Sequence, residues 1–183
     1  MIPFVTFVAI MTLSWIVFRV VARDPYRTNH KLTLRSSFLE TSIFFVHGCS
    51  SYVYLDSEPS AIRLNSLSFM LAATLIILGL VAVYFSMSRL GLSVSIGQNV
   101  QGLRKIGPYR FSRNPQIVAY FFVVVGYSLL WPSLLGALWV SLYLAIAHMM
   151  VRTEEEHLTV LYGVEYRQYC SNTPKYIGLA KQP

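Results

Sequence analysis

The sequence predicts an all-α, polytopic membrane protein that forms a single domain over residues 1–183. Three observations predict this fold class. Hydrophobic residues make up 55% of the chain and charged residues only 13%, whereas a soluble domain carries roughly 25% charged residues. The charged residues also gather in clusters between long apolar runs. Five of these runs approach the ~20 residues that an α-helix needs to cross the hydrocarbon core of a bilayer.

The five apolar segments differ in strength. They cover approximately residues 2–21, 38–55, 67–87, 115–131 and 134–151. The second is the weakest, because Glu40, His47 and several serines interrupt it. Residues 131–133 leave room only for a tight hairpin between the last two segments, with an aromatic residue at its tip. Arg19 and Arg23 follow the first segment and no cation precedes it, so we expect a retained helix and not a signal peptide.

The charges of the connecting segments predict an orientation. The first three connections carry net charges of +4, −1 and +5. Because cytoplasmic loops are enriched in Lys and Arg, we expect the N-terminus outside and the C-terminus in the cytoplasm. The membrane would be the inner membrane of a prokaryotic cell or the endoplasmic reticulum of a eukaryotic one. The formal charge of +7 fits the same rule and anionic headgroups, so we expect a bilayer and no nucleic acid as partner.

The two cysteines predict no metal site. Cys49 and Cys170 lie far apart in the sequence and form no Cys-x-x-Cys pair. They therefore provide neither a disulfide framework nor the ligand spacing of a zinc site.

Residues 98–119 do not read as a plain connection. They are long for a loop between adjacent membrane helices and rich in Gly, Arg, Tyr and Asn, which let a backbone wrap around a polar ligand. Asn114 and Pro115 predict a helix start, with Asn at the N-cap and Pro at the first helical position. The unsatisfied N–H groups there, beside Arg110 and Arg113, would suit an anion or a ligand carboxylate. An ordinary basic loop at the membrane surface is the alternative.

Residues 152–177 form the second unusual segment. Three consecutive acids, residues 154–156, end the predicted last membrane helix, and their mutual repulsion requires a cation or water nearby. Beyond them an apolar face recurs at a spacing of three to four: Leu158, Leu161, Tyr162, Tyr166 and Tyr169. This spacing predicts a short amphipathic helix that lies on the membrane or over the preceding loop. A solvated acidic turn, or an ion pair between Arg152 and Glu156, would explain the acids without a site.

Together the two segments resemble a known superfamily. G-P-Y-R-F-S-R-N-P begins at Gly107, and E-E-x-x-L-x-x-x-Y-G-x-E-Y-x-x-Y, followed by T-P-K-Y, begins at Glu154. Both blocks at this spacing resemble the isoprenylcysteine carboxyl methyltransferase and phospholipid methyltransferase superfamily. The resemblance covers roughly residues 98–177. It implies an integral membrane methyltransferase that uses S-adenosyl-L-methionine without a Rossmann domain, and no glycine-rich nucleotide motif is present.

The resemblance also implies site residues. Segments 98–117 and 152–177 would fold together over the cofactor in the cytoplasm. The candidate cofactor-binding residues are Gln98, Gln101, Gly102, Leu103, Arg104, Tyr109, Asn114, Pro115, Gln116, Ile117, Glu154, Glu155 and Glu156. The candidate catalytic residues are Arg113, Arg152, which would lie near the substrate, and Glu155. One glutamate would hold the ammonium group of the cofactor: the spacing to Tyr162 and Gly163 favours Glu154 and Glu155, whereas a match to R-T-E-E-E favours Glu156.

The resemblance leaves the methyl acceptor open. The carboxyl methyltransferases usually read Arg-His-Pro, whereas this chain reads Arg-Asn-Pro at residues 113–115, and the Tyr and Gly that usually follow are Ile117 and Ala119. We expect a lipophilic acceptor that enters between helices, of the prenylcysteine type. The alternatives are a phospholipid amine or another small hydrophobic acceptor and, third, a non-enzymatic membrane scaffold. A carboxylate nucleophile needs an orienting cation such as Arg113 or Arg152, whereas an amine must lose a proton.

Overall fold

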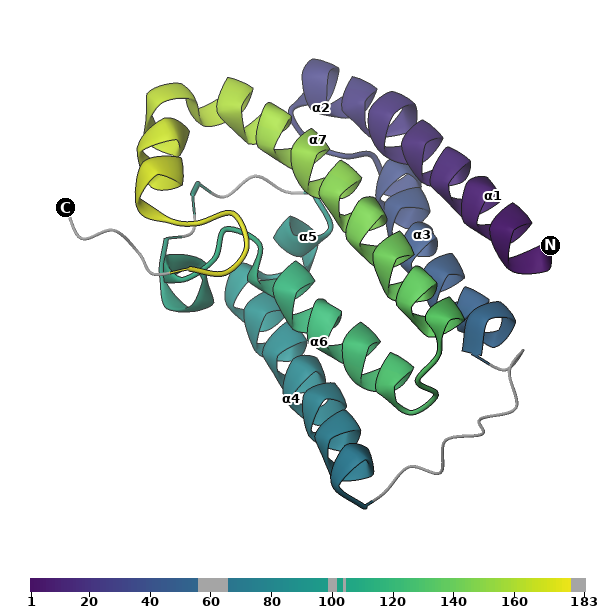
Figure 1. The fold of residues 1–183 in the computed structure, drawn as a ribbon. Helices are drawn as coiled ribbons and strands as arrows, with labels where there is room; N and C mark the ends of the chain where they lie inside the picture. Colours follow the sequence, from purple (N-terminus) through teal and green to yellow (C-terminus); the bar gives the residue numbers. More distant parts are fainter. Residues whose placement is uncertain (56–65, 99–101, 104, 179–183) are drawn as a thin grey trace.

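The computed structural model describes residues 1–55, 66–98, 102–103 and 105–178. These residues contain helices and no strand, which confirms the predicted all-α class. In chain order the elements are α1 (Ile2–Ile16), the π-helical turn η1 (Val17–Val21), α2 (Arg23–Asn29), α3 (Leu34–Leu55), α4 (Ser66–Leu90), α5 (Leu92–Ser95), the 3-10 turn η2 (Gly107–Arg110), α6 (Pro115–Leu129) and α7 (Leu134–Asn172). Figure 1 shows their arrangement.

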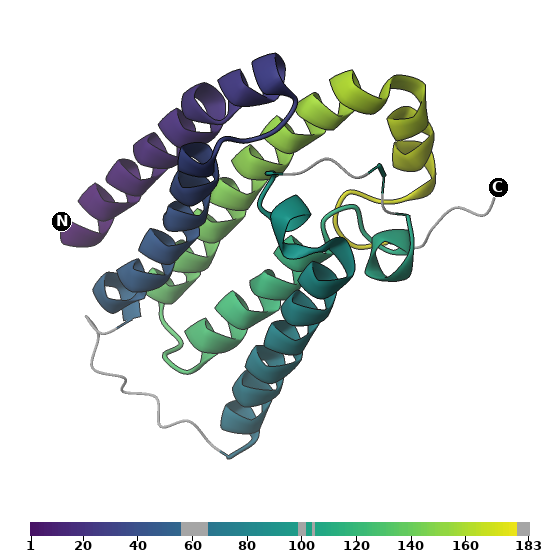
Figure 2. The same cartoon turned by 180° about the vertical axis from the view of Figure 1, so that it is seen from behind.

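The helices form two groups that are joined through α6 and α7. Helices α1, α3 and α7 pack side by side, and α4 packs lengthwise against α6, as the two opposite views show (Figures 1 and 2). The main hydrophobic core lies where α1, α3, α6 and α7 meet, and it contains Phe18, Ile43, Leu142, Tyr143 and Ile146. This core fixes the position of α7 relative to α1 and α6.

Glycines allow the backbones of α4 and α6 to approach each other closely. A Cβ atom added at Gly79 would lie 2.9 Å from the backbone oxygen of Ala119. A Cβ atom added at Gly126 would lie 2.8 Å from the backbone oxygen of Ala72. Small residues at such positions are typical of helix packing inside membranes. The α4–α6 pair is therefore held together by backbone contact over much of its length.

Three of the described helical stretches are long and apolar enough to cross a membrane. They are Ile2–Asn29, Ser66–Leu90 and Leu134–Asn172. Helix α6 is apolar but has only 15 residues. Helix α3 has 22 residues, and its polar residues Glu40, His47 and Ser50 are buried, as expected for polar groups at membrane depth. All five predicted segments form helices and the membrane class is confirmed, while the number of crossings and the orientation stay predictions.

Helix α7 is longer than we predicted. The sequence predicts that the last membrane helix ends at the acidic run and that a separate amphipathic helix follows. Instead, the helix continues through the acids, because glutamate is a good helix former, and bends at Gly163 (φ 50°, ψ −116°). Glycine adopts such a backbone conformation readily, whereas other residues do so only with strain. The segment after Gly163 turns back towards η2 (Figure 1).

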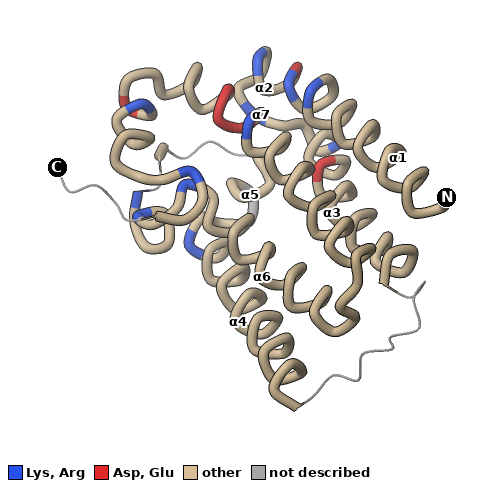
Figure 3. The backbone as a smooth tube through the Cα atoms, in the orientation of Figure 1, with Lys and Arg blue, Asp and Glu red and all other residues tan. Residues whose placement is uncertain are grey.

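The charged residues of the described chain gather at one end of the bundle. They lie where α1 passes into α2, around residues 152–156 of α7, and near η2, whereas the opposite ends of α4, α6 and α7 carry none (Figure 3). The apolar part of α7 that can lie in the membrane, Leu134–Val151, ends at this level. The charged end is the side that the loop charges predict to be cytoplasmic.

Candidate active site

A cavity of about 100 Å³ opens at the charged end of the bundle. We call it the Glu154 cavity. Its lining residues come from α2, the end of α4, α5 and the turn after it, the loop before α6, and α7: Tyr26, Leu90, Val94, Gly97, Gly102, Leu103, Tyr109, Arg113, Gln116, Glu154, His157, Leu158, Leu161, Tyr162 and Tyr169. Both segments that the sequence singled out therefore contribute to one cavity.

Glu154 contributes an unpaired carboxylate to this cavity. Its Oε2 atom is buried and has no hydrogen-bond partner among the described residues. The residue lies beyond Val151, where the apolar part of α7 ends. Burial, and then the neighbouring charge of Glu155, raise the pKa of Glu154 from 4.5 to about 7. A buried carboxylate without a partner is costly, and a strongly perturbed pKa in a cleft marks a candidate functional residue.

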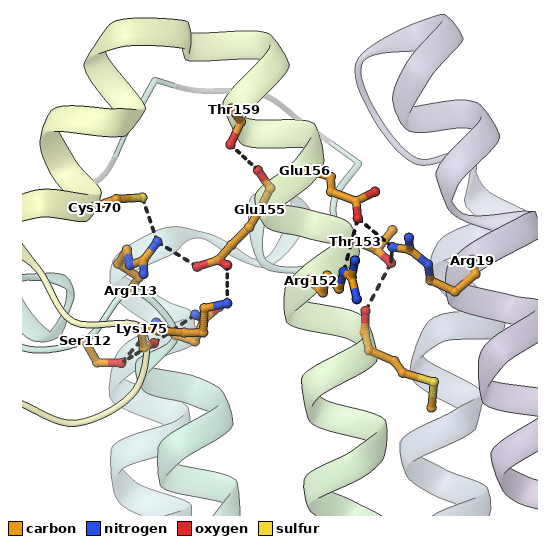
Figure 4. Close-up of polar contacts among 12 residues, drawn as sticks. Arg19, Ser112, Arg113, Arg152, Thr153, Glu155, Glu156, Thr159, Cys170 and Lys175 are labelled. Atoms are coloured by element: carbon orange, nitrogen blue, oxygen red, sulfur yellow. Dashed lines mark hydrogen bonds and ion pairs between the residues drawn. The ribbon is translucent and has the colours of Figure 1, made fainter.

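Glu155, by contrast, forms ion pairs with two cations of the chain itself, although its Oε1 atom, like Oε2 of Glu154, has no hydrogen-bond partner among the described residues. Its Oε1 atom lies 2.7 Å from Nη1 of Arg113, and its Oε2 atom lies 2.5 Å from Nζ of Lys175. Nη1 of Arg113 also donates to Sγ of Cys170 at 2.6 Å. Figure 4 shows these contacts. Glu155 thus connects α7 to the start of α6 and to the segment that follows α7.

Glu156 lies on the other side of α7 from Glu155 (Figure 4). Its Oε1 atom lies 3.0 Å from Nη1 of Arg19 and 3.5 Å from Nε of Arg152, and its Oε2 atom lies 3.4 Å from Nη2 of Arg23. Consecutive residues of an α-helix point about 100° apart, so the three glutamates have three different environments. Among them, Glu154 alone lines the cavity.

Tyrosine hydrogen bonds hold the end of α7 over the loop before α6. The hydroxyl of Tyr169 donates to the carbonyl oxygen of Tyr109 at 2.7 Å. The hydroxyl of Tyr109 in turn donates to Oε1 of Gln116 at 3.0 Å. Burial, and then the charge of Glu154, raise the pKa of Tyr109, so this hydroxyl stays protonated and acts as a donor. The bend at Gly163 makes the first contact possible, because it turns Tyr169 back towards the loop.

A stacked pair of rings, Tyr26 and His157, forms the wall of the cavity next to α2. The ring centroids lie 4.2 Å apart and the planes are inclined by 18°. Burial, and then the neighbouring His30, lower the pKa of His157, so its imidazole is neutral near pH 7. Gly97 (φ 72°) packs beside this wall, and a Cβ atom there would lie 2.8 Å from the hydroxyl oxygen of Tyr26.

The structure separates the predicted site residues into those that line the cavity and those that do not. Gly102, Leu103, Tyr109, Arg113, Gln116 and Glu154 line it. Glu155 contacts Arg113 at the edge of the cavity, and Gln98 is half-buried beside Gly97 without lining it. Asn114, Pro115, Ile117, Arg152 and Glu156 lie elsewhere. Gln101 and Arg104 lie outside the described residues.

The geometry at the start of α6 explains why only one of the four site residues predicted there, Gln116, lines the cavity. Asn114 is the N-cap and Pro115 the first residue of α6, as predicted, but the Asn114 side chain makes no capping hydrogen bond. Its Nδ2 atom donates instead to the carbonyl oxygen of Lys175 at 3.0 Å. The side chain of Ile117 packs in the core. Because successive positions of a helix point in different directions, Gln116 faces the cavity while its two neighbours do not.

Five lining residues were not predicted: Tyr26, Leu90, Val94, Gly97 and His157. Tyr26 lies in the connection between the first two apolar segments, for which we interpreted only the net charge. His157 follows Glu154 by three residues, and residues three apart in a helix are neighbours on its surface, so this spacing was a usable signal. The apolar residues Leu158, Leu161, Tyr162 and Tyr169, predicted as one face of an amphipathic helix, line the cavity as well.

The fold and the cavity define a class: a helical membrane protein with a small, partly polar cavity that an acidic helix lines at the charged end of the bundle. The chain belongs to the phospholipid methyltransferase family, whose model matches residues 67–165. The match runs from α4 through α6 and the acidic run of α7 to just beyond Gly163. No curated protein and no solved structure matches the chain. The predicted superfamily is confirmed, and the protein is a membrane methyltransferase of the phospholipid and isoprenylcysteine type.

Proposed function

We propose that this protein is an S-adenosylmethionine-dependent methyltransferase that binds its cofactor in the Glu154 cavity and methylates a lipophilic acceptor. The observation that carries the proposal is the buried carboxylate of Glu154, which has no partner among the described residues. Its neighbours Glu155 and Glu156 are both paired with cations. The ammonium group of the cofactor would supply the missing partner of Glu154.

The other residues of the cavity fit the remaining parts of this cofactor. The aromatic rings of Tyr26, Tyr109 and Tyr162 provide surfaces for an adenine base or a sulfonium cation. Arg113 lies on the same wall and suits the cofactor's carboxylate. The cavity of about 100 Å³ is smaller than the roughly 300–1,000 Å³ of typical ligand pockets, so binding requires part of the wall to move outward.

Methyl transfer requires mainly that the acceptor atom, the methyl group and the sulfur are aligned and that water is excluded. S-adenosylmethionine supplies, when bound, a methyl group that its sulfonium sulfur already activates. The apolar side chains of Leu90, Val94, Leu158 and Leu161 keep the cavity dry, and a dry, well-aligned site favours an in-line displacement. The acceptor would enter sideways from the membrane. An apolar groove of about 370 Å³ between α6 and α7, lined in part by Phe121 and Leu144, provides a route.

The charges around the cavity favour an amine acceptor over a carboxylate of the prenylcysteine type. A carboxylate would need a further cation, but we assign Arg113 to the carboxylate of the cofactor, and Arg152 lies on the far side of α7 against Glu156. An amine needs a group that takes the proton released on methylation. His157 lines the cavity, and we propose its imidazole as this group. We therefore propose a phospholipid amine as acceptor, with the prenylcysteine-type carboxylate as second candidate.

Two measurements on protein purified in detergent or nanodiscs test the proposal. Calorimetry should detect S-adenosylmethionine binding, and the absence of binding by folded protein would refute the cofactor assignment. Incubation with methyl-labelled cofactor and a membrane lipid extract, in parallel with a farnesylcysteine analogue, identifies the acceptor. We expect the label in an amine-containing phospholipid. Label in the farnesylcysteine analogue alone would establish the second candidate instead.

A further inference from the structure

A second cavity, of about 590 Å³, lies between α2 and α7 on the outer side of the Tyr26–His157 wall. Arg23 and Arg27 line it from α2, and Arg152 and Glu156 line it from α7. We call this cavity the arginine groove. Tyr26 and His157 line both cavities, so one layer of aromatic rings separates the arginine groove from the Glu154 cavity.

The arginine groove carries an excess of positive charge. Three guanidinium groups, those of Arg19, Arg23 and Arg152, share the single carboxylate of Glu156. The other carboxylate at the groove, that of Glu155, is paired with Arg113 and Lys175 outside it. Arg27 forms no ion pair with any described residue. The groove therefore offers an incoming anion one unpaired guanidinium group, that of Arg27, and three others that share one internal carboxylate.

The arginines of this cluster are ordered by the local helix geometry and are not a random collection of surface charges. Arg19, Arg23 and Arg27 follow one another at intervals of four residues, so they share one face of the helix. The π-helical turn between α1 and α2 sets the rotation of that face: the N–H group of Ala22 donates to the carbonyl oxygen of Val17 at 2.8 Å. Such turns are frequent at functional sites. Nη1 of Arg19 also donates to Oγ1 of the buried Thr153 at 3.3 Å.

The position and geometry of these groups indicate the ligand. Arg19 and Arg152 lie directly beyond the apolar parts of α1 and α7, at the level of lipid headgroups. Planar guanidinium groups bind phosphate oxygens in pairs. We propose that the arginine groove is a binding site for a phosphoryl group, supplied by a phospholipid headgroup at the membrane surface. The inference does not depend on methyl transfer.

Three single substitutions in the full-length, detergent-purified protein test this site. The probe is short-chain phosphatidylglycerol below its micelle concentration, titrated by calorimetry. Arg27→Gln should weaken binding about tenfold, the loss expected for one charge-assisted contact, and should leave folding intact because Arg27 is exposed. Glu156→Gln should strengthen binding, because it removes the internal anion that competes for the arginines. Arg35→Gln, an exposed arginine at the start of α3, is the matched control and should change affinity less than twofold.

Equal weakening by Arg27→Gln and Arg35→Gln would show general attraction to a basic surface and overturn the proposal. Unchanged or weaker binding by Glu156→Gln, with an unaltered unfolding temperature, would do the same. A parallel titration with inorganic phosphate separates the two sources of the phosphoryl group. Failure of phosphate to compete supports the lipid, and competition at equal affinity overturns the lipid as the source. S-adenosylmethionine affinity should be the same in Arg27→Gln and parent, which keeps this test apart from that of the Glu154 cavity.

Discussion

Substitution of Glu154 by Gln should weaken cofactor binding and stabilise the cofactor-free protein. Folding raises the pKa of this carboxyl group from 4.5 to about 7. The folded protein therefore binds the proton more tightly than the unfolded chain, and this group makes the protein less stable as the pH rises from about 4.5 to about 7. At ~1.4 kcal/mol per pKa unit, the shift from 4.5 to about 7 corresponds to a cost on the order of 3–4 kcal/mol above pH 7. Glu154→Gln removes that cost.

The effect on binding has the opposite sign. An ammonium group held next to Glu154 would lose its counter-ion in the variant. Removing one partner of a buried ion pair costs roughly 3–5 kcal/mol, which corresponds to two or more decades in affinity. Gln keeps the size and the helix propensity of Glu, so a loss of this magnitude would reflect the charge.

The assay combines calorimetry with S-adenosylmethionine and thermal unfolding of the cofactor-free protein at pH 5 and pH 8. We expect the unfolding temperature of Glu154→Gln to exceed that of the parent at pH 8 and to approach it at pH 5. Glu156→Gln is the control and should bind the cofactor as the parent does, because Glu156 contacts Arg19, Arg23 and Arg152 away from the cavity. Parent-like affinity in Glu154→Gln, or a lower unfolding temperature at pH 8, would refute the reasoning.

Three further predictions concern the backbone and the topology. Gly163→Ala should cost about 1–3 kcal/mol, because residue 163 has φ 50°, and it should also weaken cofactor binding; an unchanged unfolding temperature would contradict this. Gly126→Val should lower the unfolding temperature by overpacking the α4–α6 contact, at about 1–3 kcal/mol, whereas Gly48→Ala in α3, whose added Cβ would lie 3.9 Å from the hydroxyl oxygen of Tyr120, serves as the control for substituting glycine. In a variant without Cys49 and Cys170, a cysteine at Ser57 should react with an impermeant reagent in intact cells and one at Lys105 should not; the reverse would exclude the proposed orientation.

The sequence predicted most of the helices because their signals are local. Apolar runs define the helices, and Asn114 with Pro115 marks the start of α6. No local signal marks where the membrane part of α7 ends. The acidic run continues the helix, and the backbone bends only at Gly163.

The site was predicted as two segments but not as a set of contacts. Which glutamate faces the cavity depends on the rotation of α7 against its neighbours, which the core residues of several helices decide together. The role of Asn114 depends on Lys175, which lies 61 residues away in the sequence. Tyr26 reaches the cavity only because α2 packs against α7, and its surrounding sequence carries no motif.

The close contact between α4 and α6 limits which wall of the Glu154 cavity can move outward when a ligand binds. Backbone oxygens lie within 3 Å of where Cβ atoms would stand at Gly79 and Gly126, so rotation of either helix that brought a larger residue to these positions would force the two backbones apart. The end of α7 after Gly163, in contrast, is held to the loop before α6 by side-chain contacts, among them the Tyr169–Tyr109 hydrogen bond and the Arg113–Cys170 contact. If a ligand enters as we propose, we therefore expect this end to move about Gly163 while the α4–α6 pair keeps its arrangement.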